Sequence, residues 1–322
     1  NMIISKTPFR ISFVGGGSDH FNSKSEVPGR VICTTINKYM YISVNKKHDN
    51  KVRLSYSVTE NVENIKKLDH LIIRKTLDFF KIYNGIEIVT IADIPSSGSG
   101  LGSSSTLTVG LTKALNKFKN QEISKKKLSE IASKIEIEKC KKPIGMQDHY
   151  AAAYGGFNSI TFNQNKSVTV NKIDISKQRI HNFKKHLVMF YSGINRKADK
   201  ILGSIKKVKK QNLHYKKLSE LSNNFEYELT KGSLYNTASI LHESWMLKKG
   251  LHKTVSNLDL DSIYENALNA GALGGKLLGA GGGGYFLFFA KPELHKNIKK
   301  RLHKFQCIDF DFSDEGSTNY IV

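Results

Sequence analysis

The stretch IPSSGSGLGSSSTLTVGLTKAL, residues 94–115, gathers glycines and serines in a short run and then becomes an amphipathic pattern. Apolar residues recur there at the spacing of one helical face, at Leu107, Leu111, Ala114, Leu115 and Phe118. The run therefore predicts a loop that opens directly into a helix. Glycines at 98, 100 and 102 allow close approach of a ligand, and a helix N-terminus carries about half a positive charge. Two interpretations follow: a phosphate-binding loop, or a tight strand-to-helix turn capped by serine.

Two familiar nucleotide-binding loops do not fit these residues. A Walker loop requires Lys-Ser or Lys-Thr at its end, and neither pair follows the glycines at that spacing. A dinucleotide fingerprint with Gly98 and Gly100 in its first two places would need a third glycine at Ser103. The interpretation of the loop therefore depends on the rest of the chain.

The composition indicates a globular protein. At 322 residues the length predicts one large or two medium domains, and the apolar and charged fractions, 39% and 24%, are ordinary. No apolar run reaches the roughly 18 residues that span a membrane. Because the N-terminus lacks the basic, apolar and small-residue order of a signal peptide, we expect a cytoplasmic protein. The three cysteines lie far apart without a CxxC, which predicts neither a disulfide framework nor a zinc site.

The formal net charge of +22 suggests a nucleic-acid partner, but the kind of basic residue argues against one. Only seven of the 50 basic residues are arginine, and the lysines are scattered through stretches such as 125–127, 206–210 and 299–301. The arginine forks and stacking aromatics that usually serve nucleic-acid recognition are not clustered. We expect a solvated lysine-rich surface, no nucleic-acid or membrane partner, and a basic field that favours anionic small molecules.

The order of predicted elements indicates an α+β protein of two domains, 1–180 and 181–322. The β-rich N-terminal region has strands over 2–17, 29–36, 38–47 and 85–94. Helices are predicted over 68–80 and 125–139, and a hairpin over 157–173. A second cycle starts near 181 with a strand over 186–193. This strand is followed by helices to about 250 and then by a helix over 260–272. The chain ends with a strand over 284–290, a helix over 292–304 and a terminal strand.

Two further glycine clusters accompany the first, PFRISFVGGGSD at 8–19 and GGKLLGAGGGGYFLFF at 274–289. With all three in order, the sequence resembles the GHMP kinase superfamily, whose motifs are an N-terminal strand and loop, a PxxxGLGSSA phosphate loop and a C-terminal glycine-rich loop. The resemblance implies an N-terminal domain like ribosomal protein S5 domain 2, a ferredoxin-like C-terminal domain, and ATP and substrate between them. It also implies that ATP is held by Pro95, Ser97, Gly98, Gly100, Leu101, Gly102, Ser103, Ser104 and Ser105.

The segment IEIEKCKKPIGMQDHYAAAYGGFN, residues 135–158, supplies acids for such a site. Asp148 follows Gly145 in a turn, where it could simply cap a helix. The resemblance implies instead that it is the catalytic base. By periodicity Glu136 and Glu138 flank the inward helical face at similar angles, so spacing does not choose between them. The resemblance implies that Glu138, together with Ser104, binds Mg²⁺.

The first and last glycine-rich motifs supply the residues that would bind the sugar that accepts the phosphoryl group. Arg10 resembles the arginine that polarises the transferred phosphoryl group in the galactokinase branch, and Ser18 and Asp19 resemble its sugar-binding pair. The residues that the resemblance assigns to substrate are Gly16, Gly17, Ser18, Asp19, Gly281 and Gly282, and the local pattern around 193–200 adds Arg196. Ser105 stands where alanine is usual, and GGGSD replaces the commoner threonine form.

The combined motifs look most like the branch that phosphorylates the anomeric hydroxyl of D-glycero-D-manno-heptose 7-phosphate, giving the 1,7-bisphosphate toward nucleotide-activated heptose for surface polysaccharide. A kinase of an unphosphorylated sugar such as fucose or galactose is the alternative. A diphosphate decarboxylase and non-catalytic members also belong to the superfamily. Arg196 follows a strand that ends at Gly193, where its guanidinium would grip a phosphate on the acceptor or be a solvated residue at a helix start.

Overall fold

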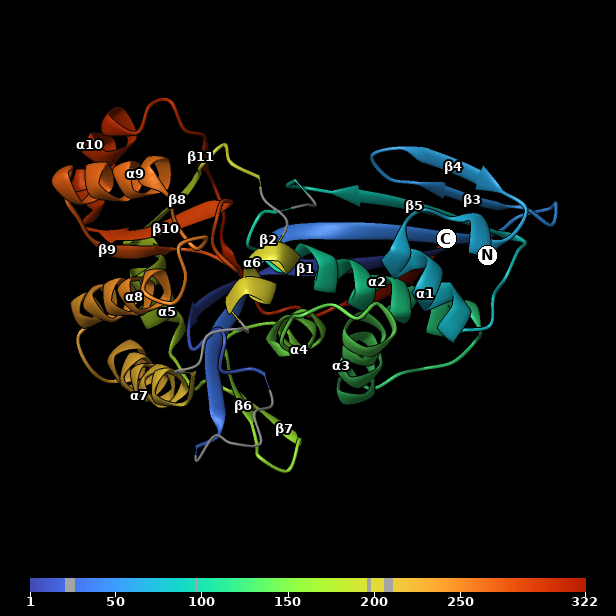
Figure 1. Ribbon diagram of the computed structural model, residues 1–322, viewed down its shortest axis with the longest axis horizontal. Coiled ribbons are helices and arrows are strands. Elements are labelled where there is room, and N and C mark those ends of the chain that lie inside the picture. Colours follow the sequence, from blue (N-terminus) through green and yellow to red (C-terminus); the bar gives the residue numbers. More distant parts are fainter. Residues whose placement is uncertain (21–26, 96–97, 196–197, 206–210) are drawn as a thin grey trace.

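The structure is a computed structural model that describes residues 1–20, 27–95, 98–195, 198–205 and 211–322. A long sheet covered by helices forms one part of the molecule, and a smaller sheet with its own helices forms the other (Figure 1). This is the α+β architecture that the sequence predicts. No helix within the described ranges is long and apolar enough to cross a membrane.

The larger sheet runs in the order β13-β1-β2-β5-β3-β4, with β6 and β12 paired to β2 and β7 paired to β6. Its strands in the described residues are β1 (Ile3–Val14), β2 (Gly29–Lys46), β3 (Val52–Ser55), β4 (Thr59–Val62), β5 (Ile86–Ala92), β6 (Asn158–Phe162), β7 (Val168–Lys172), β12 (Phe312–Ser313) and β13 (Thr318–Ile321). The predicted hairpin over 157–173 is confirmed as β6 and β7. The prediction of separate strands at 29–36 and 38–47 is wrong, because β2 continues through both and pairs with β6 and then β5.

Strand β1 is irregular where it approaches the site. Its register against β2 shifts between Pro8 and Arg10 and again between Ser12 and Val14. Such bulges bend a strand and change the direction of a side chain, and they are common beside active sites. Arg10 therefore lies next to one irregularity and Phe13 within the other.

Helices cover one face of this sheet. They are η1 (Ile65–Lys67), α1 (Leu71–Phe79), α2 (Ser103–Phe118), α3 (Lys125–Lys134), the π-helical turn η2 (Ile135–Lys139) and α4 (Gln147–Tyr154). Helix α2 packs on β1 and β2 through a buried face that includes Leu111 and Leu115 (Figure 1). The predicted single helix over 125–139 is wrong in its last turn, since Cys140 donates its backbone N–H to Ile135 across five residues.

The smaller sheet is antiparallel in the order β11-β8-β10-β9. Its strands are β8 (Leu187–Tyr191), β9 (Ala272–Leu277), β10 (Tyr285–Ala290) and β11 (Cys307–Ile308), and the helices of this part are α5 (Lys177–Lys185), α6 (Ala198–Ile205), α7 (Gln211–Thr230), α8 (Leu234–Lys249), α9 (Leu258–Asn269), η3 (Pro292–Leu294) and α10 (His295–Arg301). Strand β9 was not predicted, because its glycines hide the strand pattern. Gly274 is required there, since a Cβ would lie 2.1 Å from the Ala238 carbonyl oxygen of α8.

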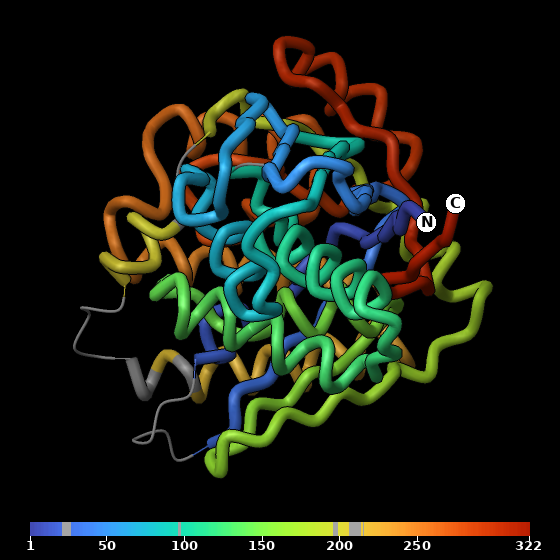
Figure 2. The backbone as a smooth tube through the Cα atoms, turned by 90° about the vertical axis from the view of Figure 1, so that its right-hand side faces the viewer, coloured from blue at the N-terminus to red at the C-terminus, as the bar shows by residue number. Residues whose placement is uncertain are grey.

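The two parts share a core. Phe13 of β1 stacks with Phe157 and Phe225, and Phe183 and Phe312 complete the cluster at ring-centroid distances of 5.3 to 6.5 Å from Phe13. The chain also returns at its end, because β12 pairs with β2 and β13 with β1. The N and C ends consequently lie side by side (Figure 2). The predicted boundary near 180 falls between β7 and β8, which belong to different sheets, and the last strands rejoin the first sheet.

Candidate active site

A cavity of about 520 Å³ brings segments from the start, middle and end of the chain together. Its walls come from β1, the loop before α2, the start of α4, the end of α8 and β9. The predicted site residues that line it are Arg10, Gly16, Gly17, Asp19, Gly98, Gly100, Gly102, Ser103, Ser104, Ser105 and Asp148. The three glycine clusters therefore meet at one cavity.

The glycine loop has the backbone that an anion cradle requires. Gly98, Gly100 and Gly102 all have positive φ, at 66°, 76° and 78°. Gly102 is the N-cap of α2, and no side chain of the cap residue bonds the first amides of the helix. Among the described residues, the serine cap of the alternative interpretation is therefore not found at the N-cap position. The uncapped amides and the helix dipole suit phosphate oxygens.

Gly102→Ala is expected to lower both stability and turnover. A Cβ at Gly102 would lie 3.2 Å from Arg10 Cγ and 3.4 Å from Asp148 Cγ, and the left-handed backbone costs about 1–2 kcal/mol for an L-residue. Gly85→Ala is the matched control, since Gly85 has φ of 66° and no atom within 4 Å of its Cβ position. Urea melts should show a similar loss for both variants. Equal turnover in the two would contradict a role for the space at Gly102.

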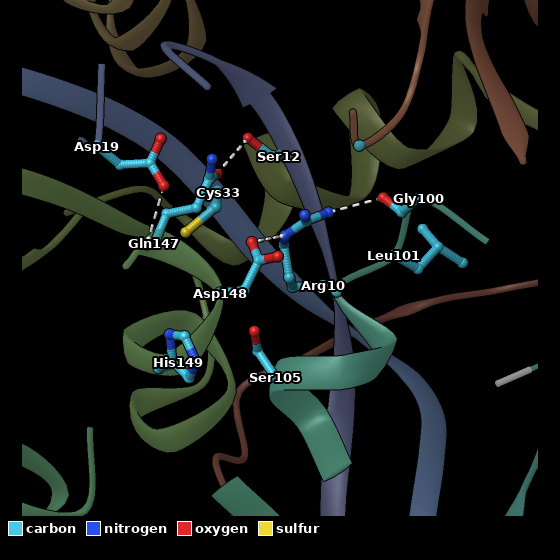
Figure 3. A network of polar contacts seen from close by, with 12 residues as sticks. Arg10, Ser12, Asp19, Cys33, Gly100, Leu101, Ser105, Gln147, Asp148 and His149 are labelled. Carbon is cyan, nitrogen blue, oxygen red and sulfur yellow. Dashed lines mark hydrogen bonds and ion pairs between the residues drawn. The ribbon is translucent and has the colours of Figure 1, made fainter. Parts of the chain in front are cut away.

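Arg10 and Asp148 form the central ion pair of the cavity (Figure 3). Arg10 Nε donates to Asp148 Oδ1 at 2.6 Å, and Arg10 Nη1 donates to the Gly100 carbonyl oxygen at 2.8 Å. The backbone N–H of Arg10 also donates to the Leu101 carbonyl oxygen at 3.1 Å. The Arg10 side chain is 4% exposed, whereas that of Asp148 is 24% exposed and borders the cavity. Arg10 thus fixes the glycine loop and the aspartate relative to each other.

The structure favours Glu136 over the predicted Glu138 as the glutamate of the site. Neither glutamate is among the residues that line the cavity, but Glu138 is exposed, whereas Glu136 is fully buried against the start of α2. Both lie in the π-helical turn, which has more residues per turn than an α-helix. A 3.6-residue period places the two glutamates at similar angles to the inward face, and in the structure that period does not hold in this turn.

Hydrogen bonds hold one carboxylate oxygen of Glu136, and the other has only an ion pair with Lys142 at 3.5 Å. Glu136 Oε2 accepts from Ser105 and Thr108 and lies 2.8 Å from His149 Nε2. Burial alone would raise the pKa of Glu136, but His149, Lys142 and the Ser104 hydroxyl lower it to about 2. Glu136 Oε1 is buried without a hydrogen-bond partner among the described residues.

This donor set fits a magnesium ion. The Glu136 carboxylate, whose Oε1 has no hydrogen bond and lies 3.5 Å from Lys142 Nζ, and the neighbouring Ser104 hydroxyl are hard oxygen ligands, and Mg²⁺ needs few of them from protein. No cluster of three or more acidic, histidine or cysteine ligands occurs in the described part of the chain. A site here would therefore depend on Glu136, Ser104 and the substrate phosphates.

Several predicted residues support the loops rather than face the cavity. Ser18 is buried, with its hydroxyl bonded to the Gly15 carbonyl oxygen and to the Arg30 backbone, which contradicts sugar binding by its side chain. Asp19 lines the cavity, but its oxygens accept the backbone amides of Gly17 and Gln147. Besides Ser18 and Glu138, the described predicted residues outside the lining are Pro95, Leu101, Gly281 and Gly282, and in the last motif Gly279 and Ala280 line the cavity instead. Ser97 and Arg196 lie outside the described residues.

Sequence reasoning missed several residues that line the cavity: His70, Lys142, Gln147, His214, Lys248 and Lys276. Gln147 stands beside Asp148, and its side-chain oxygen accepts from the Ser12 hydroxyl at 2.7 Å (Figure 3). Lys276 stands inside the third glycine cluster. The neighbouring motifs were a signal for these two, but any other single lysine among the 43 in the chain has no distinguishing pattern.

Comparison with known proteins matches this geometry. Residues 65–156 match the family described as GHMP kinases N terminal domain, and residues 225–308 match GHMP kinases C terminal. The chain is 33% identical to the D-glycero-alpha-D-manno-heptose 7-phosphate kinase of Campylobacter jejuni subsp. jejuni, with 99% of each protein covered. It is 26% identical to the galactokinase of Pyrococcus furiosus over 92% of this chain and 91% of that protein.

Solved structures agree. A putative sugar kinase from Campylobacter jejuni is 30% identical with a TM-score of 0.79, covering 99% of this chain and 98% of that one. A D-glycero-D-manno-heptose 1-phosphate kinase from Bacteroides thetaiotaomicron has a TM-score of 0.81 over 99% of each chain at 24% identity, which supports the fold. Fold and site together define a phosphotransferase. The chain belongs to the GHMP kinase family, and it is an ATP-dependent sugar kinase.

Proposed function

We propose that the chain transfers the γ-phosphoryl group of ATP to the anomeric hydroxyl of D-glycero-D-manno-heptose 7-phosphate. The products are ADP and the 1,7-bisphosphate, which would lead toward nucleotide-activated heptose for surface polysaccharide. The observation that carries the chemistry is the Asp148 carboxylate, held by Arg10 beside the glycine loop. A cytoplasmic location, where ATP is available, is part of the proposal.

The ion pair suits proton removal and charge stabilisation at one place. The acceptor O–H bond breaks as its oxygen bonds to the γ-phosphorus, the proton passes to an oxygen of Asp148, and the bond to the β-phosphate oxygen breaks. Arg10 lies within reach of Asp148 and Gly100, where its guanidinium can stabilise the charge on the transferred group. Because little covalent chemistry is needed, alignment of these groups accounts for most of the catalysis.

The nucleotide phosphates would be held by the uncapped start of α2. Ser103, Ser104 and Ser105 follow Gly102 there and line the cavity. Glu136 and Ser104 would hold Mg²⁺, which supplies neutralisation of phosphate charge when bound. The relative from Campylobacter jejuni supports the heptose acceptor, while a bifunctional fucokinase of Arabidopsis thaliana, 26% identical over 92% of this chain, favours an unphosphorylated sugar as the second candidate.

ADP release with a panel of acceptors tests the proposal. Heptose 7-phosphate, unphosphorylated heptose, fucose and galactose are compared by kcat/KM at fixed ATP and magnesium. The proposal expects the highest value for heptose 7-phosphate. A higher value for fucose, galactose or unphosphorylated heptose would replace it with the simple sugar kinase.

A further inference from the structure

Two lysines face the cavity without a carboxylate partner. Lys248, near the end of α8, and Lys276, in β9, both line it. None of the ion pairs between described residues includes either one. The other two lysine or arginine residues of the lining, Arg10 and Lys142, are both paired with carboxylates. The positive charge of Lys248 and Lys276 is therefore left for something that enters the cavity.

Lys276 is the more deeply buried of the two. It is 4% exposed, and its ammonium donates to the Phe13 carbonyl oxygen at 2.9 Å, at the second irregularity of β1. An ammonium has three N–H donors, and a buried one is costly unless it is paired. Burial lowers the pKa of Lys276 well below its ordinary value, and the charges of Lys248 and Arg10 lower it further. An anion would offset this cost.

Lys248 lies where the last glycine cluster approaches the aspartates of the cavity. Its ammonium donates to the Gly279 carbonyl oxygen, three residues after Lys276, and α8 packs against β9. The charges of Asp19 and Asp148 act on Lys248 directly, so it lies near the base and near the loop after β1. The nucleotide phosphates are assigned instead to the start of α2.

We propose that Lys248 and Lys276 form a subsite for a phosphate group that the acceptor already carries. The inference rests on the proposed function and names residues that select its substrate. A phosphate monoester carries about −1.5 to −2 charges and three acceptor oxygens, which match two ammonium groups with unused donors. Binding it gives the two lysines the direct ion pair that neither forms with a carboxylate of the described residues.

Lys248→Met and Lys276→Met test the subsite, with Lys249→Met as the matched control. Lys249 is the adjacent lysine, but it pairs with Asp261 at 2.5 Å and does not line the cavity. Charge-assisted hydrogen bonds contribute enough that each lining variant should lose about 10- to 150-fold in kcat/KM for heptose 7-phosphate. The KM for ATP and the kcat/KM for unphosphorylated heptose should stay near wild type. Lys249→Met should behave as wild type with both sugars.

Calorimetric binding of the two sugars in the presence of ADP provides a readout that does not need turnover. Wild type should bind heptose 7-phosphate more tightly than heptose, and Lys248→Met should abolish that preference even if Lys276→Met does not fold. Equal losses for both sugars, or a raised KM for ATP, would overturn the inference and assign the lysines to the nucleotide phosphate. If wild type binds heptose 7-phosphate through the lysines but releases no ADP, the proposed function fails and the anion subsite stands.

The pH dependence gives an independent check. Burial lowers the pKa of Lys248 to about 8, so its attraction for phosphate is present below pH 8 and is lost above it. The charged and titratable groups that act on or beside Lys248 are Arg10, Asp19, Asp148, His214 and Lys276. We expect kcat/KM for heptose 7-phosphate to fall above about pH 8 in wild type, since this ratio follows the free enzyme. Lys248→Met should lack that fall, and a fall of the same size in the variant would contradict the assignment.

Discussion

Asp148→Asn is expected to lower kcat by about 10²- to 10⁴-fold, the usual contribution of a general base. The variant should fold, because a carboxamide oxygen can still accept from Arg10 Nε, although loss of the counter-charge for the buried guanidinium should lower the melting temperature. Steady-state kinetics at a temperature where circular dichroism shows a folded variant, together with calorimetric ADP binding, separate catalysis from folding. ADP affinity should be unchanged.

Asp19→Asn is the comparison for this prediction, because Asp19 is the other carboxylate that the first glycine cluster brings to the cavity. Its oxygens are used by the backbone amides of Gly17 and Gln147, so we expect it to change the KM for the acceptor more than kcat. A near-normal kcat in a folded Asp148→Asn variant, or a larger kcat loss at Asp19, would remove Asp148 from the role of base.

Glu136→Gln is expected to raise the magnesium concentration for half-maximal activity by more than the roughly 10- to 100-fold that outer partners of metal ligands contribute. The reason is that Glu136 presents a buried oxygen without a hydrogen-bond partner beside Ser104. Magnesium titration of activity measures the effect. Magnesium-dependent thermal stabilisation in the presence of ADP measures the same site without turnover, and it should weaken in the variant.

Glu138→Gln is the matched control, since it makes the same change two residues away in the same π-helical turn. Its side chain is exposed rather than buried against Ser104 and Ser105, so the magnesium requirement should match wild type. Should Glu138→Gln shift the titration more than Glu136→Gln, the assignment made from the structure would be wrong and the one implied by the family resemblance right.

Local patterns were sufficient where a residue type is required by the backbone or by one helical face. Glycines with positive φ at 98, 100 and 102 and the apolar face of α2 both follow from short-range rules, and the structure has the loop and helix where they were predicted. The hairpin of β6 and β7 was likewise predictable from alternation and turn residues. Strand β9 was not predictable from such rules. Its Gly274 is required by the close packing of α8, and α8 is separated from β9 in the sequence.

The sequence by itself determined the three glycine clusters, the helix that follows the phosphate loop, and the position of Asp148 after a glycine turn. Only the tertiary structure decided between Glu136 and Glu138, because a single π-helical turn changes which side chain faces α2. Only the tertiary structure separated Lys248 and Lys276 from the lysines of the surface. Whether the ammonium group of a lysine has a carboxylate partner depends on which residues β1, α8 and β9 bring near it. The local spacing of residues in the sequence does not contain that information.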